Sequence, residues 1–155
     1  MKHALRNCMM LVLGLAVMQA IAAAQDAPRL EGVWNVNVTI HDCNTGQPIR
    51  DIRALNLFIH DGSMTETGAS IQPARSRSSS IGTWRHLKDN TYTSTFRFFR
   101  YNPDGSFFSA AKVTRMIELS QDGSQFISTG TVEDFDLNNV RIGVSCPTEM
   151  ATRAE

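Results

Sequence analysis

The sequence predicts an all-β protein folded as a single closed antiparallel up-and-down barrel of about eight strands. Residues 25–155 show no helical periodicity. Short β-prone runs alternate instead with turn residues at close intervals, which is typical of a barrel or a sandwich. An even number of strands brings the last strand antiparallel to the first, so that the sheet can close and lose both edges. A two-sheet sandwich would show the same alternation and is the alternative.

The turn residues divide the domain into strands. Asp-Gly and asparagine-rich groups tolerate the positive φ angles that tight hairpins require. Between these groups we expect eight strands, at residues 32–42, 51–60, 63–69, 80–87, 91–102, 107–120, 125–135 and 140–154. The one long connection, 70–79, carries Pro73, Arg75, Arg77 and several serines, and we expect a mobile loop or a lid there.

Apolar alternation sets the expected register, because facing residues of a hairpin share one face of the sheet. The expected inward pairs are Val38 with Leu55, Val36 with Leu57, Trp34 with Ile59, Ile59 with Met64, Leu57 with Glu66, Thr83 with Phe96, Leu87 with Tyr92, Phe96 with Val113 and Tyr92 with Ile117. The other face is mostly polar. The pattern therefore predicts one inward stripe that is apolar along most of its length.

Two residue pairs indicate that the first and last strands meet. Cys43 with Cys146 and Trp34 with Arg153 fit nearly the same antiparallel ladder, and a bulge at Pro147 would absorb the small difference. An even pair of cysteines in a small exported domain also predicts a disulfide. We therefore expect a Cys43–Cys146 bridge between these strands.

The N-terminal segment, 1–24, predicts a removable signal peptide. Lys2 and Arg6 precede 17 uncharged residues, Cys8 to Ala24, and this run ends in three alanines. A membrane-spanning helix is the alternative, but the run is at the lower limit of the length needed. We expect cleavage after Ala24, a domain over 25–155, and a secreted or periplasmic location.

Charge and motif content exclude several function classes. Residues 25–155 carry 13 basic and 15 acidic side chains without a basic stripe, which argues against nucleic acid and, after cleavage, against membrane surfaces as partners. His41, His60 and His86 lack the spacing of metal ligands, and we expect the first two at opposite barrel ends. No cofactor-binding or nucleophile motif is present, so we expect no metal and no cofactor.

Short motifs suggest a family resemblance. Gly32-Val33-Trp34 at the head of the first strand resembles the Gly-x-Trp motif of lipocalin-like (calycin-type) barrels. The chain also looks like small secreted bacterial proteins of unassigned role, through the segments 82–84, 96–99 and 151–153. The resemblance implies that Trp34 plugs the closed end and that Arg153 lies across it as a structural partner. Allene-oxide-cyclase-like barrels, which host cyclases and isomerases, have a similar strand plan.

The inward stripe includes polar residues, which small barrels bury only when they are paired or functional. The predicted inward polar residues are Glu66, Arg85, Ser94, Arg115, Ser128 and Glu149, with Arg53, Asp134 and Arg141 nearer one rim. One interpretation is internal ion pairing, for example of Glu66 with Arg85. The other is a ligand site formed by Glu66, Arg85, Tyr92, Ser94, Phe96 and Arg115, with Glu66 and Glu149 as candidate acid–base groups.

These observations favour an exported barrel that binds a small apolar or amphipathic ligand in its lumen. One alternative is a cofactor-independent isomerase or cyclase that uses the inward carboxylates. Another is a filled barrel that acts through its surface. Phe99, Tyr101 and Phe108 predict an exposed apolar patch, which hints at a homodimer contact.

Overall fold

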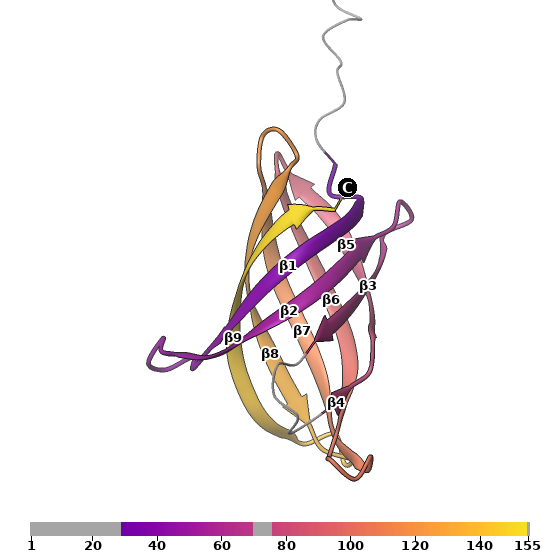
Figure 1. Ribbon diagram of the computed structural model, residues 1–155, viewed down its shortest axis with the longest axis vertical. Helices are drawn as coiled ribbons and strands as arrows, with labels where there is room; N and C mark the ends of the chain where they lie inside the picture. Colours follow the sequence, from indigo (N-terminus) through magenta and orange to yellow (C-terminus); the bar gives the residue numbers. More distant parts are fainter. Residues whose placement is uncertain (1–28, 70–75, 155) are drawn as a thin grey trace, which may run out of the picture.

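A computed structural model describes residues 29–69 and 76–154 (Figure 1). The expected signal peptide and residues 70–75 of the expected loop lie outside the described residues. Nine strands are present: β1 (Gly32–His41), β2 (Pro48–Phe58), β3 (Ser63–Ala69), β4 (Ser76–Arg77), β5 (Ser80–Lys88), β6 (Thr91–Tyr101), β7 (Phe107–Leu119), β8 (Gln125–Phe135) and β9 (Arg141–Arg153). None of the described residues lies in a helix, so this part of the chain has no helix able to cross a membrane.

Eight long strands close into an antiparallel barrel, which confirms the predicted fold. Each pairs with its neighbours, β1 pairs with β9, and the β6–β7 ladder completes the circuit. The ninth strand, β4, is an addition: it pairs with β6 beyond the beginning of β5, inside the segment predicted as a loop. Figure 1 shows the end of β9 and the C-terminus at the top of the barrel, and β4 near the opposite end.

Three Asp-Gly turns form as the sequence predicts. The carboxylates of Asp61, Asp104 and Asp122 each accept a hydrogen bond from the backbone N–H two residues further on. The glycine that follows each aspartate takes a positive φ, which a side chain would disfavour. These local bonds fix the tight hairpins and, with them, the order of strands around the barrel.

The registers of the later strands and of the closing pair are confirmed. Phe96 faces Val113, Tyr92 faces Ile117, and Trp34 faces Arg153. The predicted bulge at Pro147 is wrong, because the β1–β9 ladder runs without a shift through the pair Ile40–Pro147. No bulge is needed there, since Cys43 lies beyond the end of β1, where the chain is already turning.

The expected registers of β1–β2, β2–β3 and β5–β6 are wrong. Trp34 faces Asn56, Met64 faces Phe58, and Phe96 faces Gly82. Because side chains alternate between faces, β2 turns Ala54, Asn56 and Phe58 inward and leaves Leu55, Leu57 and Ile59 exposed. On β5 the same reversal places Trp84 against the core and exposes Arg85 and Leu87.

Candidate functional site

The closed end of the barrel, where β1 begins and β9 ends, is filled by aromatic and aliphatic side chains. Trp34 is fully buried and packs edge-on against Phe126, with ring centroids 4.9 Å apart, and its indole N–H donates to the Leu30 carbonyl at 2.8 Å. The Arg153 guanidinium lies over the indole, 4.3 Å from the ring centroid, and donates to the carbonyl oxygens of residues 29, 31 and 123. These contacts seal this end.

Gly32 explains why the chain has Gly-x-Trp at this point. Its φ is +117°, and a Cβ built there would lie 2.8 Å from Nη1 of Arg153. Any side chain would therefore displace the guanidinium that covers Trp34. The motif and the last-strand arginine form one structural unit.

A cavity of about 230 Å³ occupies the other end, which we call the open end. Its apolar walls include Phe96, Phe98, Val113 and Val132, which point inward from β6, β7 and β8. The remaining lining residues are Val38, Ile40, Ile49, Arg50, Ile52, Glu66, Ser76, Arg77, Arg100, Phe108, Asp134, Ser145, Pro147 and Glu149. The lining thus combines an apolar body with several charged groups, as ligand cavities do.

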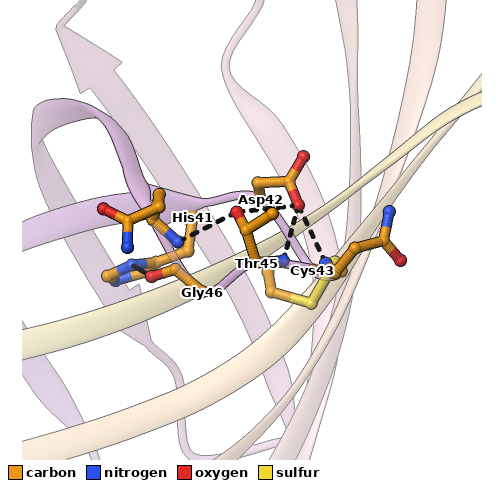
Figure 2. Close-up of a disulfide and its surroundings, with 8 residues drawn as sticks. His41, Asp42, Cys43, Thr45 and Gly46 are labelled. Carbon is orange, nitrogen blue, oxygen red and sulfur yellow. Dashed lines mark hydrogen bonds between the residues drawn. A yellow bond between two sulfur atoms is a disulfide. The ribbon is translucent and has the colours of Figure 1, made fainter.

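The predicted disulfide, Cys43–Cys146, joins the β1–β2 turn to β9 beside this cavity (Figure 2). Cys146 lies between two lining residues, Ser145 and Pro147. The turn itself is held by Asp42, whose carboxylate accepts from the backbone N–H groups of Asn44 and Thr45, both at 2.9 Å. The covalent bond and the turn together fix one side of the open end.

A buried layer of hydrogen-bonded charges separates the cavity from the closed end. Arg115 is fully buried; it donates to a carboxylate oxygen of Glu149 and, through Nε, to the Ser94 hydroxyl at 2.8 Å. Ser128 donates to the same Glu149 oxygen at 2.7 Å. The Asn56 amide, oriented so that both its ends are satisfied, accepts from Nη2 of Arg115 at 2.9 Å and donates to Oε2 of Glu66 at 3.1 Å. The alternation of β2 does not predict Asn56 here, because it places the apolar Leu55 and Leu57 on the inward face.

Glu66 is buried in this layer, but its main partner is not the expected one. Pairing with Arg85 is wrong, since Arg85 is exposed on the outer face of β5. Nη2 of Arg77 lies 2.9 Å from the Glu66 carboxylate, and Nη1 of Arg115 lies 3.9 Å away. Burial raises the pKa of Glu66 above its ordinary value, while the charges of Arg77 and Arg115 oppose that rise.

Arg77 reaches the lumen from β4 and, like Asn56, is a site residue that sequence reasoning missed. Its guanidinium lies 3.6 Å from the Phe98 ring centroid. On β3, a Cβ at Gly68 would lie 2.6 Å from its Nη1, so Gly68 leaves the space that the guanidinium occupies. The only local signal was an arginine in a serine-rich segment, which is equally typical of a solvated loop.

The rim of the open end carries a second ion pair. Nε of Arg100 donates to Asp134 at 2.8 Å, and Ser109 donates to the same carboxylate oxygen at 3.2 Å. Asp134 lies near this rim, as expected. Arg53 and Arg141 lie at the same end, but both side chains are exposed rather than turned into the lumen.

The structure thus brings together part of the predicted ligand set. Of the predicted binding residues, Glu66 and Phe96 line the cavity, as does the candidate acid–base residue Glu149, whereas Ser94 and Arg115 lie behind it and Tyr92 packs in the closed end. Only Phe99 of the expected patch is exposed, and it contacts Phe107. Tyr101 is half-buried, and Phe108 lines the cavity.

The histidines are separated. His41 lies at the open end near Gly46 and Thr148, and His60 lies at the closed end next to Glu31. Among residues 29–69 and 76–154, no group of three or more histidine, cysteine or acidic side chains is arranged to hold a metal ion. The charged groups that line the cavity are carboxylates and guanidinium groups, beside its apolar walls.

No family model, no curated protein and no solved structure matches this chain.

Proposed function

We propose that this protein is an exported barrel that binds a small amphipathic molecule in the cavity at its open end. The observation that carries the proposal is the cavity itself, with Phe96, Phe98, Val113 and Val132 on its walls and charged groups at one side. An apolar body buried against these walls gains the hydrophobic free energy of binding, and the charged groups orient it. The Gly32–Trp34–Arg153 unit supports a lipocalin-like barrel as the scaffold.

Two further features support export. The uncharged run that precedes Gln25 has the composition of a secretory signal. The Cys43–Cys146 disulfide is of the kind that persists in an oxidising compartment. Together the two features support a secreted or periplasmic location.

The test is binding of the neutral apolar fluorophore N-phenyl-1-naphthylamine to the domain 25–155. We expect saturable binding that Val132→Trp abolishes, because the new ring fills the cavity. The matched control is Thr129→Trp, an exposed position on the same strand, which leaves binding unchanged. Should Val132→Trp fail to fold, Ile52→Phe on the half-buried wall provides the same test. No binding by the unsubstituted protein, or equal binding by filled and control variants, would contradict a lumen site.

A second candidate is a cofactor-independent isomerase, favoured by one observation. Glu66 and Glu149 both line the cavity, and burial raises the pKa of Glu66 toward the range that acid–base catalysis uses. If the bound molecule were a substrate, Glu66→Gln or Glu149→Gln would abolish its conversion without abolishing binding. Mass spectrometry of what co-purifies with the protein, before and after incubation, distinguishes a converted molecule from a retained one.

A further inference from the structure

Arg77 and Arg100 form an unusual pair of like charges at the cavity. They are direct cross-strand partners in the β4–β6 ladder, and both side chains line the cavity. Both guanidinium groups contact the same ring, with their central carbons 3.6 Å and 5.0 Å from the Phe98 centroid. Like charges placed directly opposite each other on paired strands destabilise a sheet unless something compensates them.

Arg77 and Arg100 each pair with one acid, Glu66 and Asp134, but the groups around the cavity include more cations than carboxylates. The cavity lining holds three guanidinium groups, those of Arg50, Arg77 and Arg100, and three carboxylates, those of Glu66, Asp134 and Glu149. Arg115, directly behind Glu149, adds a fourth cation to the same cluster. With all groups ionised, these described residues carry four positive and three negative charges, and the additional cation is Arg50 at the exposed start of β2.

One donor of Arg77 also has no acceptor. Its Nε is buried without a hydrogen-bond partner among the described residues, although the same guanidinium donates to Glu66 at 2.9 Å through Nη2. Leaving a buried donor unsatisfied is costly, and such groups are rare in native proteins. The space left by Gly68 on β3 and the ring of Phe98 on β6 determine where the group lies, so its position is built into the fold.

We propose that the cavity selects a small organic anion, whose carboxylate lies against Arg77 and Arg100 while its apolar body lies along Phe96, Val113 and Val132. This inference rests on the proposed binding function and specifies its ligand class. An added carboxylate neutralises the excess charge and relieves the repulsion between the two arginines. It also gives the Arg77 guanidinium, one of whose donors has no acceptor, a second carboxylate. A cationic ligand would instead compete with arginines that already pair with every carboxylate of the cavity wall.

The experiment compares three ligands of equal chain length, namely octanoate, octanol and octylammonium, as competitors of bound N-phenyl-1-naphthylamine. We expect octanoate to compete at concentrations about tenfold or more below octanol, and octylammonium to compete worst. Octanol equal to octanoate, or octylammonium the strongest, would overturn the anion preference while leaving a lumen site intact. Absence of fluorophore binding would instead contradict the proposed function itself.

Substitutions then locate the preference. Arg77→Gln should weaken octanoate about tenfold to a hundredfold and leave octanol unchanged. Gly68→Ala keeps the charge but displaces the guanidinium, so it should weaken octanoate in the same way, even if Arg77→Gln fails to fold. Arg97→Gln, an exposed position on the outer face of β6, removes the same charge outside the lumen and should change neither ligand. Equal loss in Arg97→Gln, or none in Gly68→Ala, would refute a site at Arg77.

Discussion

The strands β1 and β9 run together from one end of the barrel to the other, but different side chains join them at the two ends. At the closed end, Arg153 covers Trp34, and the buried side chains there include Leu30, Phe58 and Phe126. At the open end, the strands are joined by the Cys43–Cys146 disulfide, and the interior holds a cavity of about 230 Å³ with ion pairs on its wall. One end is a packed core; the other keeps space and charge inside.

This difference assigns separate tasks to the two halves. Close packing at the closed end supplies stability, because aromatic rings there lose contacts wherever a void is made. The layer around Arg115 satisfies its polar groups and isolates that core from the cavity. The open end is less closely packed because it contains the cavity. There the Cys43–Cys146 disulfide links β9 to the turn that follows β1, where interior packing contributes less.

The largest expected effect comes from removing one aromatic ring at each end. Trp34→Ala should lower the free energy of unfolding by about 3–5 kcal/mol, because it opens a cavity in a packed core. Phe108→Ala should lower it by less than about 2 kcal/mol, since Phe108 is half-buried and already borders the cavity. Urea denaturation of both variants measures the difference. Equal losses would mean that the open end is packed as tightly as the closed one.

The next effect concerns the disulfide. Replacing both Cys43 and Cys146 with serine should lower the free energy of unfolding by about 2–4 kcal/mol, because the bond joins residues 103 positions apart in the chain. Hydrogen exchange should speed up most at Ile40 and least at Trp34, which Arg153 still covers. An unchanged melting temperature, or uniform loss of protection along β1, would contradict a bond that supports the open end alone.

Sequence reasoning succeeded where alternation and short turns act together. The strand boundaries fall within about three residues of those observed, and the β6–β7 and β7–β8 faces are correct because Phe96, Val113 and Val132 leave only one apolar choice. The burial of Glu66, Arg115 and Glu149 was likewise predictable from parity along their own strands. The meeting of Trp34 with Arg153 followed from an even strand count.

Sequence reasoning failed where the interior is polar. On β2, the apolar Leu55 and Leu57 look like inward residues and Asn56 like an outward one, yet Asn56 is needed inside to bridge Glu66 and Arg115. The β5 error has a steric cause. A Cβ at Gly82 would lie 2.2 Å from the Thr95 carbonyl oxygen and 2.4 Å from the Cβ of Phe96, so the close approach of β6 requires a glycine there. A rule that places apolar residues inside cannot detect either requirement.

Arg77 was missed for a different reason. A strand of only two residues has no periodicity to detect, and its partner Arg100 lies on a strand that already has a neighbour. What fixes Arg77 is tertiary: the face of Phe98, the gap left by Gly68 and the charge of Glu66. None of these residues is adjacent to Arg77 in the sequence. The candidate site therefore depends on a residue whose position the sequence pattern does not indicate.

The smallest effect contrasts a carboxylate from each half in one NMR titration. Asp122, in the turn at the closed end, accepts hydrogen bonds from Ser120 and Ser124, which lower its pKa from the ordinary 3.8 to about 2. Its pairing therefore stabilises the fold above pH 3.8, and that contribution is lost as the pH falls toward 2. The pKa of Glu66, at the cavity, shifts in the opposite direction. Burial raises it above 4.5, so the contribution of Glu66 to stability is present at lower pH and is lost as the pH rises through the raised value.

Two variants test these assignments. Ser124→Ala should move only the pKa of Asp122 back toward 3.8, and Arg77→Gln should raise only the pKa of Glu66 further. If Glu66 titrated at its ordinary value, the charged layer would be open to water and the division between the two halves would fail.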